Sequence, residues 1–181
     1  EMCIRDRKNM NLVVCNNLVK NLIEKKYKGT VKTSLIRNGV DIKAPRDELM
    51  VSEGRSLKPY NILTIGTLWE GKNKKMAILA FNEILKKKIN CVLWILGNGD
   101  QLQQLKQLSS SLGISDRVKF VTYFEDVMQY LNIGTLYWST SNSEGFSIAN
   151  LEAMSMAVPA IVTDIEGNQE MLDPWPECRV P

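Results

Sequence analysis

Two glutamates frame the start of an expected helix near residue 145, where their chemistry suits a ligand rich in hydroxyl groups. Glu144 and Glu152 have seven residues between them, Gly145 leaves room for a close approach, and Ser147 begins the helical pattern. A carboxylate repels phosphate but accepts hydrogen bonds from paired hydroxyls, whereas the free N–H groups at a helix start attract anions. The pattern predicts a diphosphate at the helix start with sugar hydroxyls on either side. Taken singly, Glu144 reads as a helix-start acid and Glu152 as a surface residue.

A lysine and a glycine-rich turn are expected close to this predicted diphosphate position. Lys72 follows Gly66 and Thr67 at the end of an apolar stretch, and its ammonium group can neutralise phosphate oxygens as a compact charge. The competing interpretation is a solvated lysine at a helix start. The segment Gly97–Gly99 is typical of a turn more than of a phosphate cradle, although it also follows an apolar stretch.

Apolar runs alternate with helical patterns over residues 62–163, which is typical of a parallel sheet covered by helices on both faces. Strands are expected at 62–66, 91–96, 117–121, 135–139 and 159–163, and helices at 74–87, 102–112, 126–131 and 147–155. The first of these helices would bury Met76, Leu79, Ala80 and Ile84, and the second Leu102, Leu105, Leu108 and Leu112. The fold class is therefore α/β, a Rossmann-like domain. Ligands of such sheets bind outside the carboxyl ends of the strands, so the loops there should carry function.

The residues before position 60 show a different organisation. Strands are expected at 11–15 and 31–36, with Asn16 capping a helix that would bury Leu18, Leu22 and Ile23. Residues 1–7 are expected to be a non-native run-in, and 8–42 the end of a preceding domain. The polar stretch 43–59 reads as a linker, and 60–181 as a second domain that is truncated at its end.

Composition excludes several kinds of protein. The 181 residues are 44% hydrophobic and 24% charged, as in ordinary globular proteins, and the net charge of +3 gives no reason to expect a nucleic-acid partner. There is no histidine, which removes Ser-His-Asp, Cys-His and histidine-ligated metal chemistry. The four cysteines form no metal-binding or disulfide pattern. With no membrane-length apolar stretch and no signal peptide, a cytoplasmic location is expected.

These motifs resemble those of the retaining GT-B glycosyltransferases of family 4, in the nucleotide-sugar-binding half of their fold. That family has Gly-Arg and Lys-Gly or Lys-Asn after its first strand, a Gly-x-Gly loop, Glu-Gly-Phe with a Glu-x7-Glu pair, and a late Gly-x-x-Glu. The counterparts here are Gly66, Lys72-Asn73, Gly97–Gly99, Glu144–Phe146, Leu151–Met154, Val158-Pro159 and Gly167–Glu170. Arg37–Asp41 resembles the turn that closes the N-terminal domain of the family. The likeness covers about residues 10–173.

The resemblance implies a role for each matched residue. Lys72 would hold the diphosphate, Glu144 the donor sugar and Glu152 the ribose, with Lys72 and Glu144 as the catalytic residues. Backbone amides of residues 146–149 would complete the anion site, and the nucleobase would rest near residues 122–124. The implied donor-binding set is Gly66, Thr67, Lys72, Asn98, Gly99, Glu144, Gly145, Phe146, Ser147, Ile148 and Glu152.

The implied reaction is transfer of a sugar, with retention, from a UDP-, GDP- or ADP-sugar to a hydroxyl of an acceptor glycan or lipid-linked glycan. Neither a cofactor nor a metal is expected, because the helix dipole and the cations take the metal's place. Any contact with the inner face of the membrane would go through the N-terminal domain, most of which lies outside this chain. The fragment alone is expected to be inactive.

One residue departs from the family pattern, and it keeps other functions open. Thr67 stands where the family usually has an arginine beside the phosphates, although Lys74 or Lys75 could supply the missing charge. A non-catalytic nucleotide-sugar-binding subunit would fit that departure. A GT-B sugar-nucleotide epimerase would share the architecture, but the run from Glu144 to Met154 favours a transferase.

Overall fold

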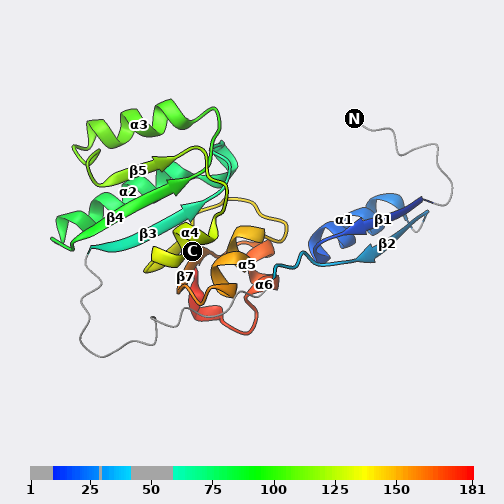
Figure 1. The fold of residues 1–181 in the computed structure, drawn as a ribbon. Coiled ribbons are helices and arrows are strands. Elements are labelled where there is room, and N and C mark those ends of the chain that lie inside the picture. The colour runs from blue at the N-terminus through cyan, green and yellow to red at the C-terminus, as the bar shows by residue number, and fades with distance from the viewer. Residues whose placement is uncertain (1–9, 29, 42–58) are drawn as a thin grey trace.

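The computed structural model describes residues 10–28, 30–41 and 59–181, and it contains two parallel sheets (Figure 1). The larger has six strands in the order β5-β4-β3-β6-β7-β8, and every neighbouring pair is parallel. Its strands are β3 (Tyr60–Ile65), β4 (Cys91–Leu96), β5 (Val118–Val121), β6 (Leu136–Ser139), β7 (Ala160–Thr163) and β8 (Arg179–Val180). The predicted run-in at 1–7 and all but the last residue of the predicted linker at 43–59 lie outside the described residues.

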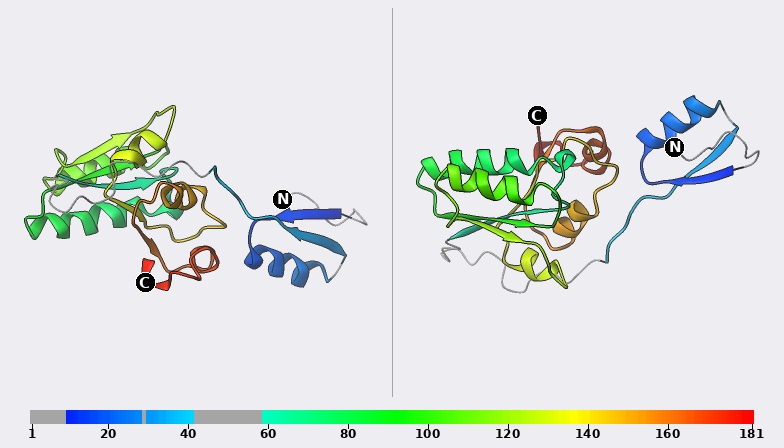
Figure 2. Two further views of the ribbon diagram at one scale, coloured as in Figure 1. Left: turned by 60° about the horizontal axis from the view of Figure 1, so that its bottom comes forward. Right: turned by 90° about the horizontal axis from the view of Figure 1, so that it is seen from above.

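Helices cover both faces of the large sheet, as the sequence predicts (Figure 2). Helices α2 (Lys74–Lys86) and α3 (Leu102–Ser111) lie on one face, and α4 (Met128–Ile133) and α5 (Ile148–Ser155) on the other. Alternation along β3 produces the two layers, because Ile62 packs in the core beneath α2 and α3 while Leu63 and Ile65 pack in the core beneath α4 and α5. The prediction of a Rossmann-like α/β fold is therefore confirmed.

The five predicted strands of this sheet are present within two residues of their expected ends, but two further elements were missed. Strand β8 has two residues and pairs with β7, and no apolar run announces it. Helix α6 (Glu166–Met171) has six residues, too few to show a helical period. Short 3-10 turns at Glu70–Lys72 and Pro176–Cys178 complete the large unit.

The predicted buried face of α2 is largely wrong, although Ile84 does pack against the core beneath the helix. Met76 and Leu79 are 39% and 41% exposed, and the helix buries Lys74, Ala77, Ile78 and Phe81 instead. These four positions follow the helical spacing of a single stripe, but a lysine occupies the first of them. A pattern counted from apolar residues alone therefore selects the neighbouring stripe. For α3 the expected face is confirmed, since Leu105 is buried and the other three leucines pack on the same core.

The N-terminal unit is a small strand-helix-strand piece beside the large sheet. It consists of β1 (Met10–Val14), α1 (Asn17–Tyr27) and β2 (Val31–Leu35), and the two strands are parallel. Asn16 caps the helix as predicted, because its Oδ1 accepts from the backbone N–H of Val19 at 2.7 Å. The expected burial of Leu18, Leu22 and Ile23 is not found, since no side chain of α1 is buried.

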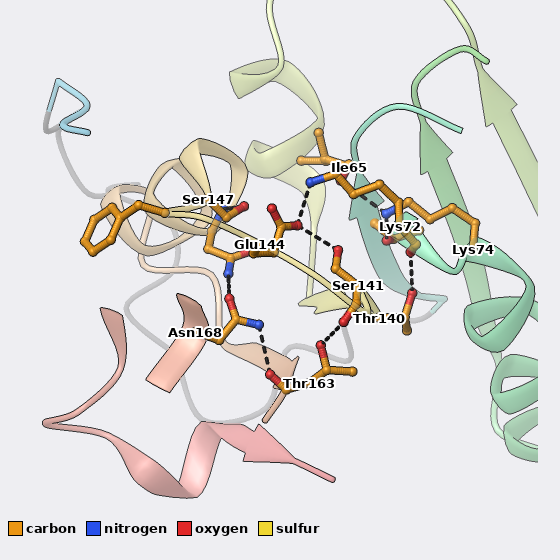
Figure 3. A network of polar contacts seen from close by, with 12 residues as sticks. Ile65, Lys72, Lys74, Thr140, Ser141, Glu144, Ser147, Thr163 and Asn168 are labelled. Carbon is orange, nitrogen blue, oxygen red and sulfur yellow. Dashed lines mark hydrogen bonds and ion pairs between the residues drawn. The ribbon is translucent and has the colours of Figure 1, made fainter. Parts of the chain in front are cut away.

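A lysine lies inside the large unit at the start of α2. Lys74 is 1% exposed, and its Nζ donates to Thr64 Oγ1 at 2.6 Å and to the carbonyl of Ile65 at 3.2 Å (Figure 3). Burial, and secondarily the charge of Lys72, lower the pKa of Lys74 to about 7, and the charge of Glu144 opposes that shift. The amine is therefore partly neutral near neutral pH.

We expect Lys74→Met to remove a pH dependence of stability that the native chain has. The pKa of Lys74 is about 7 in the folded chain against an ordinary value of 10.5. The unfolded chain therefore binds more protons between these values, and stability is gained as pH rises and lost as it falls toward 7. Between about pH 7.5 and pH 9, the free energy of unfolding of the native chain should rise by about 2 kcal/mol relative to that of the variant.

Urea denaturation at several pH values measures this difference. Lys75→Met is the control, because Lys75 is the exposed neighbour of Lys74 on the same helix. Equal pH slopes for the native chain and for Lys74→Met would show that Lys74 keeps its proton when folded.

Candidate functional site

Two loops at the carboxyl ends of neighbouring strands meet through an ion pair. Lys72 lies in the turn after β3, Glu144 lies in the loop after β6, and these strands are adjacent in the sheet. The Nζ of Lys72 lies 2.6 Å from Oε1 of Glu144 (Figure 3). Their side chains are 21% and 8% exposed, so the pair is largely shielded from water. The structure thus brings together the two residues predicted to be catalytic.

Glu144 is further fixed by a chain of hydrogen bonds that reaches across the sheet. Ser141 Oγ donates to Oε1 of Glu144 at 2.7 Å, and Thr163 Oγ1 donates to the carbonyl of Ser141 at 2.6 Å. Asn168 Nδ2 then donates to the carbonyl of Thr163 at 2.9 Å. Lys72, Ser141, Glu144, Thr163 and Asn168 form what we call the Glu144 network (Figure 3). It holds the carboxylate in one place before any ligand arrives.

Backbone contacts fasten the Lys72 turn to the loop after β6. Thr140 Oγ1 donates to the carbonyls of Lys72 and Asn73 at 3.2 and 3.0 Å. The N–H of Asn142 donates to the carbonyl of Gly71 at 2.8 Å, and Asn73 Nδ2 donates to Asn142 Oδ1 at 3.0 Å. The ion pair is therefore set between two loops that are already joined, which limits the freedom that either side chain must lose on pairing.

The start of α5 lies directly after Glu144 and is anchored from beneath. Ser147 is buried and caps the helix, with its Oγ accepting from the N–H of Asn150 at 3.4 Å. The Asn150 side chain accepts from Tyr137 Oη at 3.0 Å and donates to Asn168 Oδ1 at 2.9 Å. Ile148 is 51% exposed at the helix start. The first turn contains no acidic residue, so its positive end can receive an anion.

Glu152 lies further along α5 and faces an open cleft of about 610 Å³. The lining comprises Gly39, Val40 and Asp41 from the segment after β2, together with Met128, Ile148 and Glu152. Burial, and secondarily the negative charge of Asp126, raise the pKa of the Glu152 carboxyl above its ordinary value. The cleft has walls from both units of the chain, and the sequence analysis placed neither Gly39 nor Asp41 near Glu152.

The middle of the Glu144 loop packs against the N-terminal unit. A Cβ added to Gly145 would lie 3.3 Å from Asn16 Nδ2 and 3.4 Å from Cys15 Sγ. The carbonyl of Phe146 accepts from Asn38 Nδ2 at 2.7 Å. Gly145 and Phe146 therefore contact the N-terminal unit directly, a relation that the sequence did not predict.

The remaining predicted residues cluster at the carboxyl ends of β3 and β4. A Cβ on Gly97 would lie 2.0 Å from the carbonyl oxygen of Gly66, and one on Gly99 would lie 2.4 Å from that of Leu68. The glycines thus allow two loop backbones to touch, in agreement with the turn interpretation. Asn98 uses its Oδ1 to accept from the N–H of Gly99 at 2.8 Å. Thr67 is exposed beside this contact.

The polar residues that support Glu144 were not among those predicted from the sequence. Ser141, Thr163 and Asn168 are buried and come from three different segments. A run of hydroxyl residues after an apolar strand, as at residues 139–141, is the one signal that could have indicated them. The hypothesis that Lys74 supplies positive charge to the phosphates is wrong, because its amine is buried against β3. Lys75 remains exposed.

The described residues offer neither a metal-binding cluster nor a membrane-spanning helix. Among residues 10–28, 30–41 and 59–181 there is no group of three or more histidine, cysteine, aspartate or glutamate side chains placed to hold a metal ion. In the same ranges, no helix combines the length and apolar character needed to cross a bilayer.

Residues 45–176 match the sequence model of the glycosyl transferases group 1 family. The chain is 27% identical over 150 residues to an uncharacterized glycosyltransferase of Haemophilus influenzae, covering 83% of this chain and 40% of that protein. It is 27% identical over 158 residues to the UDP-Gal:alpha-D-GlcNAc-diphosphoundecaprenol alpha-1,3-galactosyltransferase of Escherichia coli, covering 81% and 40%. The chain thus spans 40% of the length of these curated relatives.

Solved glycosyltransferases share the fold. The pneumococcal O-GlcNAc transferase GtfA, solved with UDP and GlcNAc, superposes with a TM-score of 0.75 at 21% identity over 88% of this chain and 31% of that one. WaaG, a glycosyltransferase of lipopolysaccharide biosynthesis, superposes with a TM-score of 0.74 at 18% identity over 93% and 48%. These likenesses identify the fold as that of GT-B glycosyltransferases. Together with the family match over well over half of its length, they lead to the conclusion that the chain belongs to the glycosyl transferases group 1 family.

Proposed function

We propose that this chain binds the nucleotide-diphosphate sugar used by a retaining glycosyltransferase of family 4 and supplies the donor side of its active site. The observation that carries the proposal is the Lys72–Glu144 ion pair beside the capped start of α5. A cation, a helix N-terminus and a carboxylate then lie together at the carboxyl end of a parallel sheet, where ligands of such sheets bind. A diphosphate linked to a sugar needs these three kinds of group.

The ion pair also suggests how the site responds to its donor. Phosphate oxygens would take over the Lys72 ammonium, and Glu144 would then be free to accept hydrogen bonds from sugar hydroxyls. When the bond between the sugar carbon and the diphosphate breaks, negative charge grows on the diphosphate. Lys72 and the first N–H groups of α5 would stabilise that charge. The sugar carbon would bond to the oxygen of an acceptor hydroxyl, and the proton of that hydroxyl would pass to the departing diphosphate. Neither a metal nor a cofactor enters this scheme.

The nucleotide would occupy the cleft that Glu152 lines. Its volume of about 610 Å³ lies within the range of ordinary small-molecule sites. A carboxylate at its wall can accept from ribose hydroxyls, which is the role proposed for Glu152. The name of one relative specifies a UDP-sugar, and the structure of another glycosyltransferase contains UDP. These names support UDP as the first nucleotide to test, with GDP and ADP beside it, and a glycan as the acceptor.

Calorimetry of this chain with UDP, GDP, ADP and their sugar conjugates tests the proposal directly. Saturable binding of one nucleotide and its sugar is the expected result. Failure of all of them to bind at millimolar concentration would contradict it. Transfer and its stereochemistry are then measured in the full-length protein that carries this segment, where the anomeric configuration of the product decides between retention and inversion.

A binding subunit without catalysis is the second candidate, and the exposed Thr67 favours it. Thr67 itself carries no charge, and the amine of Lys74 is turned toward Thr64 in the core. Nucleotide-sugar binding without transfer or hydrolysis in the full-length protein would favour this candidate over the transferase.

We expect Glu144→Gln to separate binding of the nucleotide from binding of the sugar. The glutamine keeps the shape but releases Lys72 from its ion pair, so UDP affinity should be kept or increased. Affinity for the UDP-sugar should fall by about tenfold, because a charge-assisted hydrogen bond to a sugar hydroxyl is lost. Calorimetry with both ligands measures the contrast. Equal losses for the two would mean that Glu144 only shapes the loop.

We expect Glu152→Gln to weaken UDP binding by about tenfold or more, because its bond with the ribose loses the charge of the acceptor. The same calorimetric titration measures it. Glu83→Gln is the matched control, since Glu83 is also helical and forms an exposed ion pair with Lys86. Unchanged UDP affinity in Glu152→Gln would refute the ribose contact.

We expect Thr67→Arg to tighten UDP binding by about 1–3 kcal/mol, because a planar cation replaces an exposed hydroxyl beside the phosphate position. Part of the gain should disappear as salt is raised, since the new charge is exposed. Lys75→Ala tests whether the neighbouring lysine already supplies that charge. No gain in Thr67→Arg, together with a loss in Lys75→Ala, would show that the position is already compensated.

A further inference from the structure

The final glutamate of the Gly-x-x-Glu motif contacts the N-terminal unit of the chain. Glu170 lies on α6, and its Oε2 accepts from the backbone N–H of Asn17 at 2.7 Å. Its Oε1 accepts from Asn17 Nδ2 at 3.0 Å. Asn17 is the first residue of α1, so the carboxylate sits at the positive end of that helix. An acidic group is favoured there over any neutral one.

The same carboxylate also receives a cation. Arg37 donates from Nε and Nη2 to Oε1 of Glu170 at 3.0 and 2.6 Å. The side chain of Glu170 is 16% exposed and that of Arg37 is 48% exposed. A partly buried carboxylate is therefore paired with a more exposed guanidinium group. We call these contacts of Glu170 with Asn17 and Arg37 the Glu170 clasp. It ties α6 to both the start of α1 and the segment after β2.

The clasp is continuous with the loop that carries Glu144. Asn38 follows Arg37 directly and donates to the carbonyl of Phe146 at 2.7 Å. On the other side, a Cβ on Gly167 would lie 2.2 Å from the carbonyl oxygen of Glu144, so α6 begins in contact with the same loop. The loop is therefore held between α6 and the N-terminal unit, with Glu170 closing the arrangement.

A buried amide marks the same interface. Asn16 is fully buried, and capping of α1 commits its Oδ1 to Val19. Its Nδ2 consequently faces Gly145, and within the described part of the chain it has no hydrogen-bond partner. An unpaired buried amide opposes docking of the two units. The charged contacts of the clasp offset that cost.

We propose that Glu170 is a positioning residue that docks the N-terminal unit against the loop that carries Glu144. It thereby sets the width of the cleft that Glu152 lines. Gly39, Val40 and Asp41 form one wall of that cleft and follow Arg37 by a few residues. The opposite wall is Ile148 and Glu152 of α5. A loosened clasp would let the first wall move while leaving the second in place. The part concerning the nucleotide rests on the function proposed above, whereas the docking does not.

Cysteine cross-linking measures the docking without any ligand. The Sγ of Cys15 lies 3.4 Å from the position of a Cβ on Gly145, so Gly145→Cys should form a disulfide with Cys15 under mild oxidation. In that background, Glu170→Gln or Arg37→Met should slow cross-linking by about threefold to tenfold, as expected for loss of partly exposed charged contacts. Glu166→Gln, an exposed acid on the same helix, is the control. Peptide mapping identifies the linked pair, and Cys15→Ser must abolish it.

UDP binding to the same substitutions, with Gly145 intact, measures the consequence for the cleft. Glu170→Gln and Arg37→Met should each weaken UDP binding by about threefold to tenfold, while the double substitution loses no more than either one. Unchanged cross-linking in Glu170→Gln would overturn the clasp. Slower cross-linking with unchanged UDP affinity would overturn its control of the cleft. If the native chain does not bind UDP, GDP or ADP, the proposed function fails, and cross-linking alone then decides the docking.

Discussion

The Lys72–Glu144 ion pair is the contact on which the candidate site depends. It joins residues that are 72 positions apart, and both partners are largely shielded. Removing either partner would leave a partly buried charge without its counter-ion, which costs more than the pair itself contributes. The surrounding polar contacts serve this pair, because Ser141 and Thr140 hold the carboxylate and the lysine backbone in register. A ligand that enters must therefore compete with an interaction that the protein already satisfies.

Much of the fold follows from the sequence because the strands of a parallel sheet that is covered on both faces are largely apolar. The strand at 91–96, for example, is bounded by polar turns and was found where expected. Lys72 and Glu144 were singled out because each follows an expected strand of the parallel sheet, and the family resemblance implied their roles. The structure shows that the two strands are neighbours, so both residues lie at one edge of the sheet. Short elements escaped, because α6 and β8 contain too few residues to show a period.

The sequence could not show which residues far apart along the chain contact each other. Lys74 reads as a surface residue until Thr64 and the Ile65 carbonyl are seen to receive its amine. Ser141 and Asn168 resemble any polar loop residue, and only the folded sheet brings them beneath Glu144. Arg37 and Glu170 are 133 positions apart, and their pairing follows from how two units sit together. Such contacts depend on tertiary geometry, which local patterns do not encode.

The strand order has a consequence for how the molecule is made. The first three strands of the large sheet, β3, β4 and β5, build outward in one direction, and β6, β7 and β8 build outward in the other. Within the sheet, the two halves pair between β3 and β6, through Ile62–Leu136 and Leu63–Tyr137. During synthesis the strands of the first half can pair as they leave the ribosome. Lys72 cannot form its ion pair until Glu144 has also emerged. The candidate site is therefore completed late in synthesis, when the two halves of the sheet pair.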